Sequence, residues 1–133
     1  MQYDEFIGQV QHRARLASSG EAVAATRATL ETLAERLAGG APDNLAAQLS
    51  PEIARFLVDW TPLAGESFDR NEFFHRVNRR EGNFDLPKSM HHARVVIGVL
   101  CEAVSEGEVQ KIRAQLPSEF DPLFEPNGAS QNN

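Results

Sequence analysis

Hydrophobic residues recur along this chain at steps of three and four positions, which is the spacing of one face of an α-helix. The clearest apolar stripes are Tyr3, Phe6, Ile7, Val10, Ala14 and Ala17; Val23, Thr26, Leu30, Leu33 and Leu37; Ile53, Phe56, Leu57 and Trp60; and Met90, Ala93, Ile97, Leu100 and Val104. The first stripe predicts a helix that ends near Ser18. No stretch shows the sustained alternation of a half-buried strand. The pattern therefore predicts an all-α fold, a helical bundle of about seven or eight helices.

Polar residues at the ends of these stripes supply helix start and stop signals. Ser18 stands three residues before Glu21, and Asp69 stands three residues before Glu72, which is the spacing of a capping box or of its aspartate counterpart. Each pair predicts the first turn of a helix. Gly82 follows the next stripe and predicts its end, because glycine adopts the left-handed conformation that closes many helices.

An internal repeat relates the two halves of the chain. A shift of 67 residues aligns residues 3–57 with residues 70–124, and 12 of the 55 aligned positions are identical. The identities are Glu5/Glu72, Phe6/Phe73, Val10/Val77, Arg13/Arg80, Arg27/Arg94, Leu33/Leu100, Glu35/Glu102, Gly40/Gly107, Ala47/Ala114, Gln48/Gln115, Leu49/Leu116 and Glu52/Glu119. Two pseudo-symmetric copies of one unit explain this pattern. We expect a single helical domain over 1–125, with a linker at 58–69 and a flexible tail at 126–133.

Length and charge narrow the classes of function. The chain has 133 residues and a net charge of -6, which opposes general attraction to nucleic acids or anionic membranes. Its single cysteine, Cys101, cannot form an intramolecular disulfide, and no apolar run approaches the roughly 20 residues of a membrane span. We expect a protein of the cytoplasm that does not enter a membrane.

Repeated charged residues are the candidate functional positions. Four arginines lie at the edges of the predicted stripes: Arg13, Arg27, Arg80 and Arg94. The repeated acids that can pair with them are Glu5, Glu72, Glu35 and Glu102. One interpretation is structural ion pairing, since an unpaired charge beside a core is costly. The other is a binding role, in which the guanidinium groups recognise a carboxylate or phosphate of a partner.

The histidines and the cysteine give no coherent catalytic or metal-binding pattern. Glu72 and His75 have the spacing of a di-iron carboxylate motif, but the aligned positions in the first half are Glu5 and Gly8. We expect His75, His91 and His92 to lie on exposed or partly exposed polar faces, and Cys101 to be a small buried or half-buried thiol. The sequence predicts no metal, no cofactor and no catalytic residue.

Several segments are similar to one protein family. They are Tyr3-Asp4-Glu5-Phe6, the helix that carries Arg27, Val77-Asn78-Arg79-Arg80-Glu81-Gly82, and Gln115-Leu116-Pro117-Ser118-Glu119-Phe120. Together they resemble the bacterial family called domain of unknown function 2267, over residues 1–125. The resemblance implies a small all-helical protein, sometimes associated with stress functions, and brings no established activity, cofactor or catalytic residue.

The sequence favours a non-catalytic accessory or interaction protein that acts through an unidentified protein partner or through self-association. The alternative is a helical nucleic-acid-binding regulator that uses the Arg76–Arg80 region. That region contains Arg76, Arg79 and Arg80 but is flanked by Glu72 and Glu81. Because nucleic-acid binders present an extended basic footprint, we expect nucleic acid to be an unlikely partner.

Overall fold

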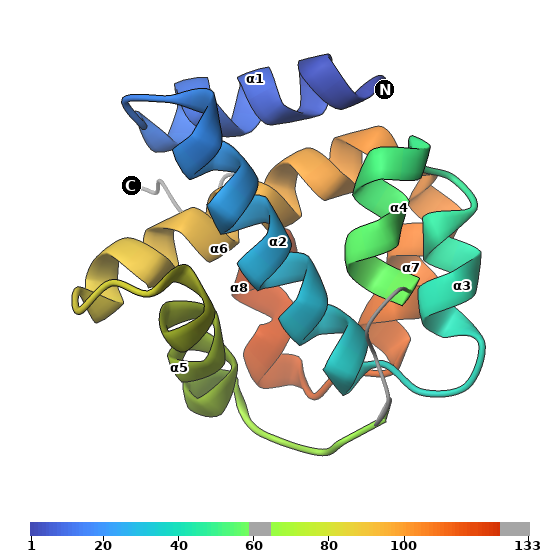
Figure 1. Ribbon diagram of the computed structural model, residues 1–133. Coiled ribbons are helices and arrows are strands. Elements are labelled where there is room, and N and C mark those ends of the chain that lie inside the picture. The colour runs from blue at the N-terminus through green and yellow to red at the C-terminus, as the bar shows by residue number, and fades with distance from the viewer. Residues whose placement is uncertain (59–64, 126–133) are drawn as a thin grey trace.

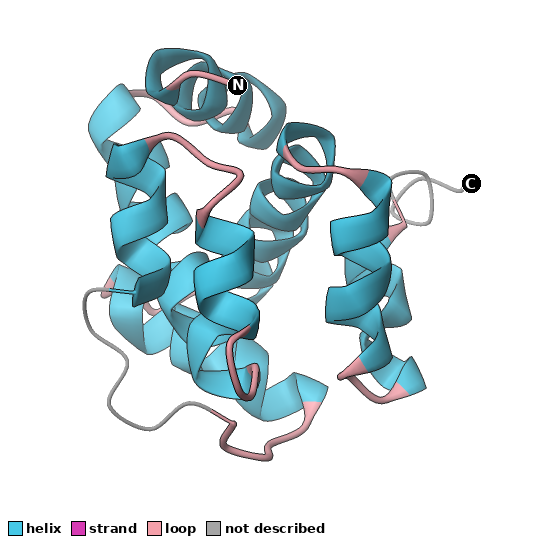
Figure 2. Cartoon of the chain, turned by 90° about the vertical axis from the view of Figure 1, so that its right-hand side faces the viewer, coloured by secondary structure: helices cyan, strands magenta, loops and turns pink. Residues whose placement is uncertain are grey.

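The computed structural model describes residues 1–58 and 65–125, and these residues form an all-α bundle (Figures 1 and 2). The helices are α1 (Tyr3–Ala14), α2 (Ser19–Arg36), α3 (Ala41–Ala46), α4 (Pro51–Val58), α5 (Arg70–Glu81), α6 (Leu86–Ala103), α7 (Glu106–Ala114) and α8 (Asp121–Phe124), with a 3-10 turn at Ser118–Phe120. The predicted fold class is confirmed. Trp60 and the predicted tail at 126–133 lie outside the described residues. No described helix has both the length and the apolar character needed to cross a membrane.

The two longest helices, α2 and α6, pack against each other at the centre of the bundle (Figure 1). Helix α1 packs on both of them, and so does α5. Helix α4 covers another part of α2, and α8 covers another part of α6, while α3 packs on α4. Each half of the chain therefore contributes helices that are packed against the other half.

The hydrophobic core contains residues from both halves in one cluster. The predicted seams lie at its centre, because Leu30, Leu33, Leu37, Ile97 and Leu100 are all at most 2% exposed. Burying an aliphatic side chain of this size contributes about 1.5–3 kcal/mol relative to leaving it in water. The core is thus assembled largely from the facing stripes that the sequence pattern identified.

The predicted helix starts are formed by side-chain caps. The Ser18 hydroxyl accepts a hydrogen bond from the backbone N–H of Glu21 at 3.2 Å, and Asp69 Oδ1 accepts one from Glu72 at 2.8 Å. These contacts satisfy N–H groups that have no partner within the helix. Gly82 ends α5 in the left-handed conformation, with φ of 76°.

Helix α1 is shorter than its apolar stripe predicts, because it ends at Ala14 rather than near Ser18. Arg15 adopts the left-handed conformation with φ of 58°, and the N–H of Leu16 then donates to Gln11 O at 2.9 Å. This is a Schellman closure, which satisfies the last carbonyl groups of the helix. The chain has left the helix by Ala17, which is exposed rather than buried.

Helix bounds follow the 67-residue shift. Moved by 67 positions, the bounds of α1 and α2 become those of α5 and α6. Gln48 Oε1 accepts a hydrogen bond from the N–H of Ser105 at 2.7 Å, and Gln115 Oε1 accepts one from Ala38 at 2.9 Å. These two contacts occupy aligned positions, and each joins one half to the other. The superposition of the two halves in space stays a prediction.

Candidate functional site

Two of the repeated arginines form ion pairs between the halves. Arg13 on α1 makes two hydrogen bonds to the carboxylate of Glu102 on α6, at 2.7 and 2.8 Å. At the aligned positions, Arg80 on α5 contacts Glu35 on α2 at 2.7 Å, and it also donates to the hydroxyl of Thr32. Bidentate pairing of this kind fixes the relative position of two helices.

Two other repeated arginines, Arg27 and Arg94, make no ion pair with an acid among residues 1–58 and 65–125. The guanidinium carbon of Arg27 lies 5.8 Å from the ring centre of Phe56, and that of Arg94 lies 5.7 Å from the ring centre of Phe74. The fold brings an aromatic face, rather than a carboxylate, within their reach, and this is a cation–π arrangement. Glu5 is exposed and makes no ion pair within residues 1–58 and 65–125.

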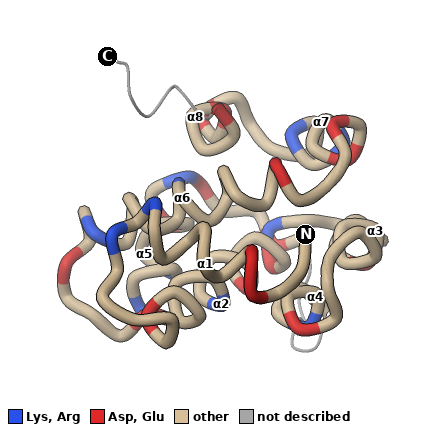
Figure 3. Tube along the Cα trace, turned by 90° about the horizontal axis from the view of Figure 1, so that it is seen from above, with Lys and Arg blue, Asp and Glu red and all other residues tan. Residues whose placement is uncertain are grey.

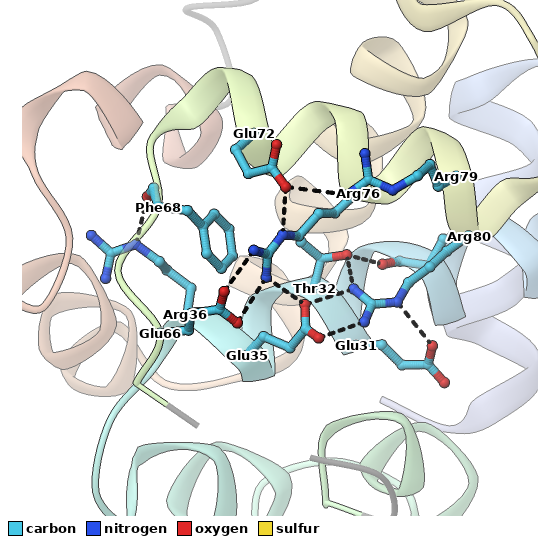
Figure 4. A network of polar contacts seen from close by, with 11 residues as sticks. Glu31, Thr32, Glu35, Arg36, Glu66, Phe68, Glu72, Arg76, Arg79 and Arg80 are labelled. Carbon is cyan, nitrogen blue, oxygen red and sulfur yellow. Dashed lines mark hydrogen bonds and ion pairs between the residues drawn. The ribbon is translucent and has the colours of Figure 1, made fainter. Parts of the chain in front are cut away.

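Arg76 lies at the centre of a larger charged network (Figure 4). Its guanidinium donates to Glu72 at 2.8 Å, to Glu66 at 2.7 Å and to Glu35 at 3.2 Å. The same group lies over the ring of Phe68, 3.9 Å from its centre. Glu72 thus pairs with its neighbour on α5 rather than with a repeated arginine. These contacts tie the segment before α5 to both α2 and α5.

The Arg76–Arg80 region is therefore occupied by the protein's own carboxylates. The side chains of Arg76 and Arg80 are both 18% exposed. Arg79 is the more accessible residue, at 63%, and it contacts Glu72. Basic and acidic residues are interspersed along the trace (Figure 3). A phosphate would have to displace existing ion pairs, so the geometry does not favour nucleic-acid binding at this region.

The ion pairs predict a loss of stability in acid. Hydrogen bonds from Arg76 hold the pKa of Glu72 below its ordinary value of 4.5, and those from Arg13 do the same for Glu102. The folded protein then binds protons less readily than the unfolded chain, so this stabilisation is present above about pH 4.5 and is lost as the pH falls further. Urea unfolding between pH 7 and pH 3 should show this decline.

Substitution identifies the groups responsible. Glu72→Gln and Glu102→Gln should each lower the free energy of unfolding at pH 7 by about 0.2–1 kcal/mol and flatten the acid decline, as expected for partly exposed pairs. Glu5→Gln is the matched control, since Glu5 makes no ion pair within the described residues. An acid decline that both test substitutions leave unchanged would contradict the prediction.

A cleft of about 670 Å³ lies between the α1–α2 turn and the α5–α6 turn, which are on the same side of the bundle (Figure 1). We call it the turn cleft. The wall from the first half is largely apolar and consists of Ala14, Arg15, Leu16, Ala17, Glu21 and Ala24. The wall from the second half is polar and consists of Glu81, Asn83, Asp85, Lys88, His91 and His92. An apolar wall facing a few converging polar groups is typical of ligand sites.

A buried polar group lies in the second wall. Glu81 Oε2 is 2.7 Å from Nδ1 of His92, and Glu81 Oε1 accepts a hydrogen bond from the Ser89 hydroxyl at 2.5 Å. The side chains of Glu81 and His92 are only 5% and 12% exposed. Burial alone would raise the pKa of Glu81, but the hydrogen bonds from His92 and Ser89 hold this pKa below its ordinary value. An ionised carboxylate only accepts hydrogen bonds, so Nδ1 carries the hydrogen and Nε2 is the remaining polar atom of the ring.

His92 is half-buried, which falls within the expectation of a partly exposed face, and the end of α5 brings Glu81 against it. The sequence did contain a signal for the polar group formed by Glu81, Ser89 and His92. Under the 67-residue shift, these three residues align with alanines of the first half, namely Ala14, Ala22 and Ala25. All three alanines are buried. The fold therefore packs well at these positions without polar side chains, and a buried charged pair is seldom stabilising compared with an apolar replacement.

Arg15 and Lys88 also occupy unfavourable positions beside the turn cleft. Arg15 has positive φ where the aligned residue is Gly82, and a residue with a Cβ incurs about 1–2 kcal/mol in that conformation. Lys88 lies in the first turn of α6, where the aligned residue is Glu21. A cation near a helix N-terminus costs about 0.3–1 kcal/mol. Neither side chain makes an ion pair within the part of the chain that the structure describes.

The remaining titratable groups are dispersed. His75 is exposed, and burial raises the pKa of the half-buried Cys101 thiol to about 11, so this thiol is a poor nucleophile. Burial, followed by the nearby charges of His92, Arg94 and Arg15, lowers the pKa of His91. The described residues contain no cluster of three or more His, Cys, Asp or Glu side chains suited to a metal ion. The expected absence of a metal and a cofactor stays a prediction.

A family model described as "Uncharacterized conserved protein (DUF2267)" matches residues 3–123. No curated protein matches the chain.

Proposed function

The chain belongs to the DUF2267 family, and from that premise we propose that it is a non-catalytic accessory protein that binds a protein partner through a surface around Phe84. The partner is either another protein or a second copy of this chain. The proposal rests on one observation, the complete exposure of a large aromatic side chain beside a cleft.

Phe84 differs from every other phenylalanine in the chain. It lies between α5 and α6 and is fully exposed, at 104%. The other seven are buried or half-buried: Phe6, Phe56, Phe68, Phe73, Phe74, Phe120 and Phe124. A phenyl ring in water contributes nothing to the core and exposes about 150–250 Å² of surface. The exposed ring is therefore available to a partner.

The position of Phe84 suits an interface anchor. Its neighbours Asn83 and Asp85 both line the turn cleft, so Phe84 stands on the segment that borders this concave surface. Binding energy at interfaces is concentrated in a few such anchors, among which aromatic residues are common. By contrast, no observation on the described residues favours the nucleic-acid alternative, because Arg76 and Arg80 are engaged with carboxylates.

We place this action in the bacterial cytoplasm. The single cysteine supports the proposal, because the chain cannot be stabilised by an intramolecular disulfide of the kind common in secreted domains. Its thiol is half-buried and resists deprotonation, so Cys101 suits a compartment in which thiols stay reduced.

Phe84→Ala should strongly weaken partner binding while leaving the fold intact. The free energy of unfolding should change by no more than about 0.5 kcal/mol, since the ring makes little contact with the core. Two measurements cover the two kinds of partner. Affinity capture from the native host, with quantitative mass spectrometry, detects another protein. Sedimentation velocity of the pure protein detects a second copy of this chain. Loss of an anchor residue should weaken binding by about 2 kcal/mol or more, which is roughly 30-fold.

Val58→Ala is the matched control, because Val58 is an exposed apolar residue of α4 that does not line the turn cleft. A specific partner should be retained by the wild type and by this control and lost by Phe84→Ala. Equal recovery with all three proteins would contradict the proposed surface. A chain that is monomeric at every concentration and captures no partner would contradict the interaction function itself.

A further inference from the structure

Three departures from the internal repeat meet in the turn cleft. Arg15 replaces the glycine that its left-handed conformation favours, and Lys88 replaces the acid that a helix start favours. The Glu81–His92 pair replaces two buried alanines. Each of these residues lowers the stability of the fold compared with the residue type at its aligned position. Destabilising residues that lie close together are typical of functional sites.

The side chains involved have a common chemistry. Arg15 and Lys88 supply two positive charges that no carboxylate of the described residues neutralises. His92 lines the same cleft and donates through Nδ1 to Glu81, whose carboxylate stays ionised at neutral pH because its pKa is held low. Arg15 and Lys88 are suited to a carboxylate, which accepts hydrogen bonds from guanidinium and ammonium groups.

Three acids line the cleft: Glu81 is bound by His92 and Ser89, and the other two lie at helix starts. Asp85 accepts a hydrogen bond from the N–H of Lys88 at the start of α6, and Glu21 lies in the first turn of α2. Both carboxylates are therefore stabilised by the positive ends of helices. None of the three acids forms an ion pair with Arg15 or Lys88 within the described residues, so both cations keep their donors for an anion.

The opposite wall accommodates an apolar group. Ala14, Ala17 and Ala24 present only methyl groups, and such small side chains leave room for a flat ring or a short chain. The volume of the cleft, about 670 Å³, lies within the range of small-molecule sites.

We infer that the turn cleft binds a small organic carboxylate with an apolar body. The carboxylate contacts Arg15 and Lys88 near His92, and the apolar body lies on the alanine wall. The same chemistry is found in a free aromatic acid and in the carboxyl terminus of a partner protein that ends in an aromatic residue. This inference goes beyond the proposed function and does not require the Phe84 surface.

Titration with phenylacetate, followed by two-dimensional NMR of the full chain, tests the site. Phenylacetate should shift the amide signals of residues 15–24 and 81–92, whereas phenylacetamide, which has the same shape but no charge, should not. N-acetylphenylalanine represents a protein carboxyl terminus. Tighter binding of this compound would assign the carboxylate to a partner, and tighter binding of phenylacetate would assign it to a free acid.

The decisive variants are Arg15→Gly and Lys88→Glu, which restore the residue types of the aligned positions. Each should weaken phenylacetate binding at least tenfold, because each removes a charged donor. Each should also leave the melting temperature unchanged or raise it by about 3 °C, because each relieves an unfavourable position. A merely structural role would not combine loss of binding with a gain in stability.

Two results would overturn the inference. One is the absence of localised shifts up to 20 mM phenylacetate, or equal shifts with phenylacetamide. The other is unchanged binding in both Arg15→Gly and Lys88→Glu. Phe84→Ala separates this site from the docking surface, because it should keep phenylacetate affinity within about twofold while losing the protein partner.

Discussion

A fragment of residues 1–64 is expected to remain unfolded, although it contains a complete copy of the repeat. In the full chain, α1 packs on α6 as well as on α2, and α2 packs on both α5 and α6. Removing the second half would expose the central seam of α2 to water. Each large aliphatic side chain so exposed loses about 1.5–3 kcal/mol, and a few of these losses exceed the roughly 5–15 kcal/mol by which a domain is stable.

Circular dichroism and thermal unfolding of the fragment measure this outcome. We expect weak helicity and no cooperative transition, compared with a sharp transition for the full chain. The ion pairs between the halves give the same expectation, because the fragment keeps Arg13 and Glu35 but loses Glu102 and Arg80. A monomeric fragment that melts cooperatively would show that each half has its own core.

Glu81→Ala is expected to be the most destabilising polar substitution at the turn cleft, at about 3–5 kcal/mol. The carboxylate accepts hydrogen bonds from His92, Ser89 and Asn83, and each of these three residues is buried or half-buried. Its removal leaves these donors without their acceptor, and an unsatisfied buried group loses its full interaction with water. Urea unfolding of the variant gives the change directly.

The triple change Glu81→Ala, Ser89→Ala and His92→Ala is the matched control, because it reproduces the alanines of the first half. We expect it to lie within about 1 kcal/mol of the wild type, so that the three changes are strongly non-additive. A triple variant at least as unstable as Glu81→Ala would show that the polar group is required for packing. Phenylacetate binding should weaken even if the triple variant is stable, which would assign the group to the ligand site.

The sequence predicted local structure well, because the relevant interactions lie within a few residues of each other. Ser18, Asp69 and Gly82 act at the helix ends that their positions indicated. The end of α1 was missed, because arginine is an unusual residue for a left-handed helix end. The three- and four-residue spacing also located the seam, because Leu33 and Leu100 face the core whichever helix lies opposite.

Pairing between helices was predicted in part. Arg13 and Arg80 find acids at aligned positions in the opposite half, namely Glu102 and Glu35. Arg27 finds no acid within the described part of the chain, because its partner depends on which helix lies across from it. In this fold the neighbour is α4, which presents the ring of Phe56. Sequence spacing specifies the face of a helix but not the neighbouring side chain.

The sequence by itself determined the all-α class, the helix starts, the apolar seam and the residues repeated in both halves, since these depend on short-range periodicity and composition. Only the tertiary structure decided that the α1–α2 and α5–α6 turns enclose one cleft. It also brought Glu81 to His92, 11 positions away, and left Glu5 exposed and without an ion pair among the described residues. Those outcomes depend on how α1 and α5 pack across α2 and α6, a long-range arrangement that no local pattern specifies.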